Sequence, residues 1–411
     1  MRRVTKGVAL GAVLAMGFGL SACGGSDDGG DSGSASGSLL IWADEKRAGP
    51  IGDLAKSWGE ENGVNVEVVQ INFDDMKDQF AQQAPAGQGP DILLGASDWS
   101  GDFTKSGLIA PIDLGDNRAQ FNPAAVDVFT IDGQTYGLPI ATENILMFRN
   151  TNLAPDAPAT INEMAAKGLE LQSAGKTQYP IGIAVGDKGN SYNSYPMLSA
   201  AGGYFFGGPD AEGNYDTTDI GLASEGGLVF AKAWGDLGKQ GAIKSTFEDA
   251  DLQSAWSAGT LPYWITGPWN SELVKESGIP FAAEGIPGWE GVDDEPKPIV
   301  GAQGFMLNQN STNPSTAQAF LDATMNTDFM DGIFAADPRP PAWNDSAEKA
   351  KDDEIIAAVL KIGENGYPNL PSLGIMYEEA GLAQKKILDG ADPVATTEEA
   401  AANVAARMGT S

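Results

Sequence analysis

The alternation that decides the fold class lies in residues 39–94, which read LLIWADEKRAGPIGDLAKSWGEENGVNVEVVQINFDDMKDQFAQQAPAGQGPDILL. Three short apolar or alternating runs are typical of β-strands, at residues 39–42, 64–68 and 91–94. Between them, apolar residues recur at helical spacing in residues 51–58 and 76–80. Strand–helix–strand alternation of this kind predicts an α/β fold with a mainly parallel sheet.

Helical spacing returns further along the chain. Residues 230–237 have apolar side chains on one helix face, and Asn313-Pro314 is typical of the N-cap and first position of a helix. From this spacing we expect three aromatic side chains in the core, those of Trp58, Phe230 and Trp234.

Composition excludes several classes of protein. The chain has 411 residues and a net charge of −31, from 25 Lys and Arg against 56 Asp and Glu. That length fits two or three domains or one two-lobed body, and so acidic a chain lacks the basic stripes that nucleic-acid binding requires. Histidine is absent, which excludes Ser-His-Asp and Cys-His nucleophiles and His-ligated metals. The single cysteine excludes intrachain disulfides and cysteine-ligated metal centres, so we expect neither a cofactor nor a metal.

The first 23 residues are typical of the signal of a bacterial lipoprotein. A basic start precedes an apolar run at residues 8–20, which is too short to span a bilayer as a stable helix. The run ends in Leu20-Ser21-Ala22-Cys23, which resembles a lipobox, and the only cysteine of the chain occupies the lipidated position. The alternative is a buried thiol that occurs there by chance.

We therefore expect a signal peptide over residues 1–22, a lipid on Cys23 and a flexible tether over residues 23–38, rich in Gly, Ser and Asp. No later stretch is apolar for 18 residues. The body is expected to be a monomer at the extracellular face of the cytoplasmic membrane, anchored through the lipid.

Polar and aromatic residues follow several predicted strands. They are Asp44-Glu45-Lys46, Ser97-Asp98-Trp99, Glu143-Asn144 and Gly267-Pro268-Trp269-Asn270. Open α/β sheets bind ligands at strand ends, and sugars need carboxylates, amines and aromatic faces. These residues suit a sugar, but composition alone leaves a peptide ligand or a solvated surface open.

From residue 39 to the C-terminal region, the chain resembles the maltose/maltodextrin-binding family of solute-binding proteins, which serve ABC importers. The resemblance rests on the order and spacing of several short motifs: Gly89-Pro90-Asp91-Ile92, Ser106-Gly107-Leu108, Pro139-Ile140-Ala141-Thr142-Glu143, Ala201-Gly202-Gly203-Tyr204, Thr266-Gly267-Pro268-Trp269 and Tyr367-Pro368-Asn369-Leu370-Pro371.

The resemblance implies two α/β lobes joined by crossing segments, with a sugar cleft between them. The implied first lobe is 39–142 plus 305–345, the second is 146–299 plus 347–411, and the crossings lie near 143–145 and 300–304. Gly301 and Gly304 suit a hinge at the second crossing.

The resemblance also implies a set of sugar-binding residues. An acid–lysine pair, an aspartate and a glutamate grip hydroxyls, while aromatic rings from the second lobe contact the sugar faces. The expected residues are Glu45, Lys46, Asp98, Trp99, Glu143, Asn144, Asn190, Tyr192, Trp269 and Tyr377.

Five positions depart from the family pattern. Gly95 replaces a Trp, Trp99 an Arg, Asn190 a Glu, Glu378 a Tyr and Gly381 an Arg. We therefore expect rebuilt outer subsites, and a disaccharide such as maltose or trehalose fits better than a long maltodextrin.

Structural roles are the alternatives for several of these residues. Glu45 and Lys46 fit a surface ion pair, Asp98 a helix N-cap and Trp269 a packed core aromatic. Three further tryptophans are expected in the core or in loops, namely Trp42, Trp289 and Trp343.

The expected function is delivery of an α-glucoside to the membrane subunits of an ABC permease, without catalysis. A secreted glycosidase is one rival, because Glu45, Asp98 and Glu143 offer carboxyl groups for such chemistry. A sugar-sensing lipoprotein that passes its ligand to a receptor is another.

Overall fold

The computed structural model describes residues 37–211 and 214–409. The expected signal peptide, the lipidation site Cys23 and nearly all of the tether lie outside the described residues. No helix in the described ranges is both long enough and apolar enough to cross a bilayer.

The first sheet has seven strands and follows the alternation expected from residues 39–94. Its main path runs β15-β14-β3-β1-β2, and β4 and β7 also pair with β14. The strands are β1 (Gly37–Ala43), β2 (Val64–Gln70), β3 (Ile92–Ala96), β4 (Ile109–Ala110), β7 (Leu138–Glu143), β14 (Ile299–Asn308) and β15 (Tyr367–Pro368). β1 is parallel to β2 and β3, whereas β14 is antiparallel to β3, β4 and β7. The expected α/β class is confirmed. The prediction of a mainly parallel sheet is wrong for β14, because this strand is antiparallel to three of its neighbours.

The crossover helices of this sheet are α1 (Ala48–Asn62) and α2 (Phe73–Gln83). α1 ends at Gly63, whose φ of 68° is accessible to glycine at little cost. At the start of α2 the Asn72 side chain accepts a hydrogen bond from the Asp74 N–H, which satisfies one of the free helical donors. These local signals explain why both helices lie where the periodicity predicts them.

The second sheet has four strands in the order β13-β8-β12-β9. They are β13 (Phe281–Glu284), β8 (Leu146–Asn150), β12 (Tyr263–Thr266) and β9 (Gly182–Ile183). Two small antiparallel pairs join β5 (Thr130–Ile131) to β6 (Gln134–Thr135) and β10 (Phe206–Gly207) to β11 (Asp216–Ile220).

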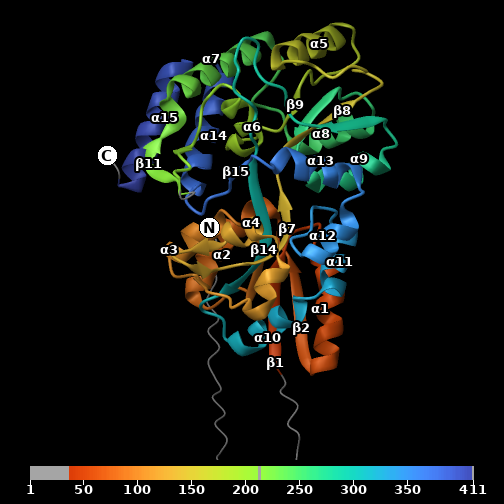
Figure 1. The fold of residues 1–411 in the computed structure, drawn as a ribbon, viewed down its shortest axis with the longest axis vertical. Coiled ribbons are helices and arrows are strands. Elements are labelled where there is room, and N and C mark those ends of the chain that lie inside the picture. Colours follow the sequence, from red (N-terminus) through yellow and green to blue (C-terminus); the bar gives the residue numbers. More distant parts are fainter. Residues whose placement is uncertain (1–36, 212–213, 410–411) are drawn as a thin grey trace, which may run out of the picture. The chain divides into compact units, whose positions relative to one another are not determined.

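The remaining helices cover the two sheets in separate groups (Figure 1). Around the first sheet lie α3 (Trp99–Lys105), α4 (Pro123–Asp127), α10 (Pro314–Thr324), α11 (Thr327–Ala336) and α12 (Asn344–Ala350). The second group contains α5 (Ile161–Ser173), α6 (Ser191–Ser199), α7 (Glu225–Gln240), α8 (Asp249–Ser257), α9 (Ser271–Glu276), α13 (Glu354–Gly363), α14 (Gly374–Leu388) and α15 (Pro393–Met408).

The buried apolar residues divide in the same way. One cluster draws on residues 39–141 and 302–343, while two others draw only on residues 145–299 and 355–404. Phe230 and Trp234 are buried and Trp58 packs against the core, which confirms the expectation for these three residues. Trp42, Trp289 and Trp343 are buried as well. The division supports two lobes, and their stated boundaries remain a prediction.

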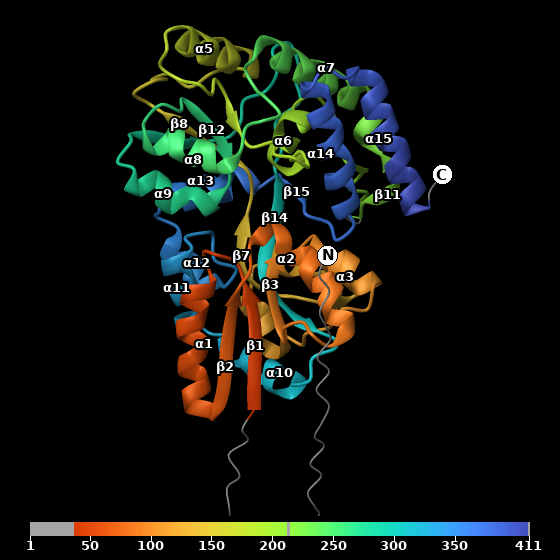
Figure 2. The same cartoon turned by 180° about the vertical axis from the view of Figure 1, so that it is seen from behind.

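β7 and β14 connect the two groups (Figure 2). Gly301 on β14 pairs with Glu143 at the end of β7, and β8 begins three residues later. A Cβ on Gly304 would lie 2.6 Å from the Leu138 carbonyl oxygen and 2.8 Å from the Phe129 ring. Glycine is therefore required here by close packing of neighbouring strands, whatever freedom it also gives a hinge.

Candidate ligand-binding site

Polar side chains gather where β1, β3 and β7 end. Asp44 and Lys46 follow β1, Asp98 follows β3, and Glu143 is the last residue of β7. β3 and β7 both run antiparallel to β14, and β1 is parallel to β3, so all three strands end at the same edge of the sheet. This edge is where open α/β sheets place their ligands.

Glu143, the last residue of β7, is buried. Its Oε1 accepts a hydrogen bond of 2.9 Å from Nε2 of Gln303 on β14. Its Oε2 accepts one of 2.6 Å from Nη1 of Arg339, which follows α11. Both bonds stabilise the ionised carboxylate in a fixed orientation.

Two arginines extend this network. Arg47 donates through Nε to Asp44 at 2.6 Å and through Nη2 to Oε1 of Gln303 at 3.0 Å, while Arg339 donates through Nε to Asp337 at 3.1 Å. Burial alone would raise the pKa of Asp44, but the Arg47 guanidinium holds that pKa below its ordinary value. Burial likewise opposes the charge of Arg339, yet Asp337 and Glu143 keep the pKa of Arg339 above its usual range. The two arginines and their acidic partners therefore hold one another in place.

The charged groups of this region are paired with one another. Arg47 lies within ion-pair distance of Asp44 and Asp337, and Arg339 within ion-pair distance of Glu143 and Asp337. The region therefore offers many hydrogen-bond donors and acceptors held by ion pairs, which suits a polyhydroxylated ligand.

Aromatic rings face this network from the second group of elements. Trp269 lies on a short 3₁₀ turn (Pro268–Asn270) directly after β12, and its ring centroid is 6.4 Å from that of Tyr192 on α6. Tyr192 in turn lies 5.9 Å from Tyr377 on α14. Burial raises the pKa of both tyrosines well above the ordinary value, so their hydroxyls stay neutral. The three rings form an apolar wall with polar tips.

Three contacts link the wall to the network. Lys46 Nζ donates to the main-chain oxygen of Trp269, and the guanidinium carbon of Arg339 lies 5.9 Å from the Trp269 ring centroid. Asn369, which accepts a 2.7 Å hydrogen bond from the Tyr377 hydroxyl, donates to Asp98 at 3.3 Å. The structure thus brings Lys46, Asp98 and Glu143 together with Tyr192, Trp269 and Tyr377.

The described part of the chain contains neither the helix cap considered for Asp98 nor the ion pair considered for Glu45 and Lys46. Asp98 occupies the position before α3, but its side chain makes no capping hydrogen bond. Burial raises the pKa of Asp98, against the opposing charge of Lys77. Glu45 and Lys46 form no ion pair in the described part of the chain, because Glu45 accepts from the Phe73 N–H while Lys46 reaches Trp269.

Trp99 is packed in the core of the first group of elements, and the ligand contact expected of it stays a prediction. Its side chain is 6% exposed and packs against Phe73 and Phe103, with ring centroids 5.0 and 6.3 Å away. A Cβ on Gly95 would lie 2.5 Å from the Trp99 ring. The two departures from the family pattern are therefore one feature: the indole of Trp99 fills the space beside Gly95.

Asn144 and Asn190 also have structural partners. Asn144 is buried and donates through Nδ2 to the Val359 carbonyl at 2.8 Å, which joins the crossing segment to α13. Asn190 caps α6 by accepting a 3.1 Å hydrogen bond from the Asn193 N–H. A ligand contact by either residue stays a prediction and is not needed to explain its position.

Sequence reasoning missed five polar residues of the site: Arg47, Gln303, Asp337, Arg339 and Asn369. Arg47 follows Asp44 by three residues, a spacing that signals a pair on one helical turn. Asn369 lies in one of the motifs that carry the resemblance and Gln303 in the second implied crossing, but neither was expected to belong to the site. Gln303 and Arg339 reach Glu143 across 160 and 196 residues of sequence, and no local pattern marks Asp337 or Arg339.

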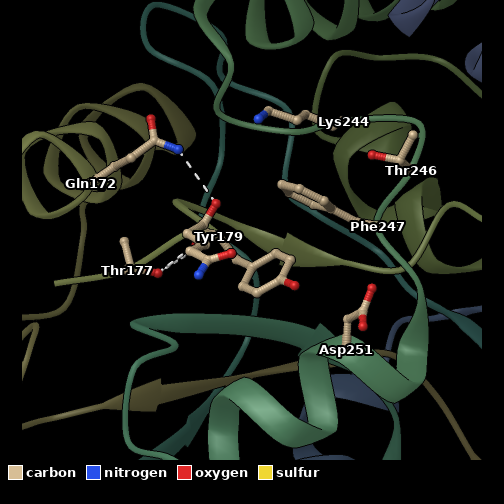
Figure 3. Close-up of a pocket in the computed structure, with 8 residues that line it drawn as sticks. Gln172, Thr177, Tyr179, Lys244, Thr246, Phe247 and Asp251 are labelled. Atoms are coloured by element: carbon tan, nitrogen blue, oxygen red, sulfur yellow. Dashed lines mark hydrogen bonds between the residues drawn. The ribbon is translucent and has the colours of Figure 1, made fainter. Parts of the chain in front are cut away.

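A separate cavity of about 410 Å³ lies on the second group of elements (Figure 3). Tyr179 and Phe247 meet there edge to face, with centroids 4.9 Å apart, and Lys244 and Asp251 are among its polar lining residues. None of the residues expected from sequence to bind sugar lines this cavity.

Comparison with known proteins now defines the class. Residues 53–359 match the family model described as bacterial extracellular solute-binding protein, and the chain belongs to this family. The α/β fold and the aromatic and polar residues that meet at the strand ends are consistent with that membership.

Several relatives have names that state the sugar they bind. The chain is 27% identical to maltodextrin-binding protein MdxE of Bacillus subtilis (strain 168), covering 96% of this chain and 95% of that protein. It is 26% identical to a maltooligosaccharide ABC transporter solute-binding lipoprotein of Streptococcus pneumoniae (strain ATCC BAA-255 / R6), covering 92% and 90%. It is 25% identical to a galactooligosaccharide-binding protein of Bacillus subtilis (strain 168), covering 94% and 93%. The resemblance inferred from the motifs is confirmed.

Proposed function

We propose that this chain is the sugar-binding component of an ABC importer, anchored outside the membrane through Cys23. Its ligand is an α-glucoside such as maltose, a short malto-oligosaccharide or trehalose, which it delivers to the permease. The observation that carries the proposal is the wall of Trp269, Tyr192 and Tyr377 opposite an ion-paired network. The names of the relatives support an importer role and the choice of sugar.

The ligand lies between two lobes that close over it. The first lobe comprises residues 39–142 plus 305–345, the second 146–299 plus 347–411, and the crossings lie near 143–145 and 300–304. The division of the buried clusters supports these boundaries. Closure brings Lys46 and Arg339 of the first lobe against Trp269 of the second.

Each side of the cleft supplies a different part of sugar recognition. Asp98 and the Glu143–Arg339 pair bind hydroxyls, because ionised groups make the stronger hydrogen bonds. Lys46 and Glu45 contribute from the loop after β1. Trp269 and the two tyrosines contact the C–H faces of the pyranose rings.

Binding without catalysis fits the site better than hydrolysis. A glycosidase needs one carboxyl group free to act as acid and another as nucleophile or base. Both oxygens of Glu143 are already bonded, to Gln303 and Arg339. The relatives are named as binding proteins. Maltotriose incubated with the protein should be recovered intact, and release of glucose would favour the hydrolase.

Calorimetry with a sugar panel tests the choice of ligand. We expect heat from maltose, maltotriose or trehalose and none from a galacto-oligosaccharide. The second candidate is a galacto-oligosaccharide, because one relative of similar identity carries that name. Binding of the galacto-oligosaccharide without any binding of an α-glucoside would contradict the proposed ligand and leave the importer role standing.

A further inference from the structure

Glu143 and Arg339 act as a single unit. Nη1 of Arg339 lies 2.6 Å from Oε2 of Glu143, and the two side chains are only 6% and 9% exposed. The other oxygen of Glu143 accepts from Gln303. Each oxygen of this carboxylate keeps about one acceptor site for a ligand hydroxyl, in an orientation that its two partners set.

Arg339 keeps unused donors. Of its five N–H groups, the one on Nε points to Asp337 and one on Nη1 points to Glu143. Nη2 makes no hydrogen bond to any residue in the described ranges. Two carboxylates hold the guanidinium in place, so little side-chain entropy is lost when Nη2 takes a further partner.

The position of Trp269 shows where that partner lies. The guanidinium carbon of Arg339 is 5.9 Å from the Trp269 ring centroid. A pyranose in van der Waals contact with the indole needs about 4 Å on each side, so it cannot enter between the two groups. A sugar stacked on the indole must therefore lie beside Arg339, with a rim hydroxyl directed at the guanidinium edge.

We propose that Arg339 is a specificity-determining residue that donates through Nη2 to one hydroxyl of a sugar stacked on Trp269. Glu143, Asp337 and Gln303 are positioning residues that orient this donor. The inference rests on the proposed sugar-binding function and deepens it, because it predicts which group of the protein distinguishes one hydroxyl pattern from another.

The inference is tested by combining a substitution of Arg339 with removal of single hydroxyls from maltose, and by comparing the two effects on affinity. Maltose and its set of monodeoxy derivatives are titrated by calorimetry into the wild-type protein and into Arg339→Lys. Lysine keeps the positive charge but lacks the planar guanidinium. We therefore expect Arg339→Lys to bind maltose about tenfold more weakly than the wild-type protein does, or more weakly still. For one deoxy derivative, the lost hydroxyl already costs the wild-type protein its contact, and Arg339→Lys should weaken binding less than twofold further.

A merely structural role gives a different pattern. If Arg339→Lys weakens the binding of every derivative by the same factor, Arg339 contacts no hydroxyl and the inference is overturned. Wild-type protein that binds no α-glucoside would contradict the proposed ligand and overturn the inference with it. The two failures are distinguished by the wild-type titration.

A control variant and a fallback variant complete the experiment. Arg149→Lys changes another buried arginine, which pairs with Glu284 through bonds of 3.0 and 2.6 Å between β8 and β13, away from the site. It should lower the melting temperature without changing any affinity. If Arg339→Lys fails to fold, Arg339→Gln combined with Asp337→Asn removes one charge of each sign, and the same single non-additive hydroxyl is expected.

Discussion

Trp269 is the residue on which both sides of the site meet. Lys46 bonds to its main-chain oxygen, Arg339 lies against its ring and Tyr192 packs beside it. The turn that carries it is stiff, because Pro268 fixes its own φ and restricts Gly267. A ring held in this way loses little entropy when a pyranose stacks on it.

Replacement of Trp269 by Ala should therefore weaken sugar binding by about 2–4 kcal/mol, the range for a hot-spot aromatic. The melting temperature without sugar should stay near that of the parent. Trp256, which is fully buried, provides the control: Trp256→Ala should cost about 3–5 kcal/mol of folding free energy through the cavity it leaves. A Trp269→Ala variant that melts like the control yet binds sugar normally would assign Trp269 to the core.

Asp98 gives the site a dependence on pH. Burial raises its pKa, against the opposing influence of Lys77 and of the hydrogen bond from Asn369, while the charge of Glu143 raises it further. The folded protein therefore binds this proton more tightly than the unfolded chain does. The stability that proton binding contributes is complete below the ordinary pKa of an aspartate and is lost as the pH rises through the raised pKa.

Sugar affinity should depend on pH in the opposite sense to this contribution to stability: it should be higher where Asp98 is ionised. A protonated Asp98 accepts hydroxyl hydrogens poorly, so affinity should fall as the pH drops through the raised pKa. Asp98→Asn should bind more weakly above that pKa and lose this dependence. Calorimetry of both proteins over a pH series from neutral to acid checks it. An unchanged pH profile in Asp98→Asn would assign the dependence to another group.

At the scale of elements, β14 is the strand that joins the two parts of the fold. It pairs with β3, β4 and β7 in the first sheet, and its first residues pair with β15. It also positions Gln303 between Arg47 and Glu143. A strand packed this closely transmits any distortion directly to the site.

Gly304→Ala should destabilise the protein by about 1–3 kcal/mol, since its Cβ would lie 2.6 Å from the Leu138 oxygen. Gly49 in α1 has nothing within 4 Å of its Cβ position, so Gly49→Ala should be neutral or stabilising by up to about 1 kcal/mol. Urea unfolding measures both. Equal midpoints for the two variants would mean that β14 can shift to accommodate a methyl group.

Elements differ in how far sequence predicts them. β1, α1, β2, α2 and β3 are consecutive, and each has a periodicity that local sequence reveals. β14 enters the same sheet about 200 residues later and antiparallel to β3, which no local pattern encodes. The site divides likewise. Asp98 and Trp269 stand at strand ends and were predictable, whereas Arg339 and Gln303 gain their roles only through contacts formed on folding.

For the whole molecule, anchoring and sugar binding should be separable. Cys23 and the Gly-, Ser- and Asp-rich residues after it are predicted to link the body to the membrane, and none of the site residues belongs to that segment. Cys23→Ala should leave melting temperature and affinity unchanged and release the protein from the membrane, because the acyl chains supply the anchor. Partition between detergent and aqueous phases measures this. A variant that stays in the detergent phase would refute the lipobox interpretation.

The most direct test of the central claim is a crystal structure of the protein with maltose. A pyranose ring should lie on Trp269, with hydroxyls bonded to Asp98 and to Nη2 of Arg339, between residues of the two lobes. Maltose bound instead in the cavity beside Tyr179 and Phe247, with the Trp269 region free of sugar at saturating concentration, would contradict the account.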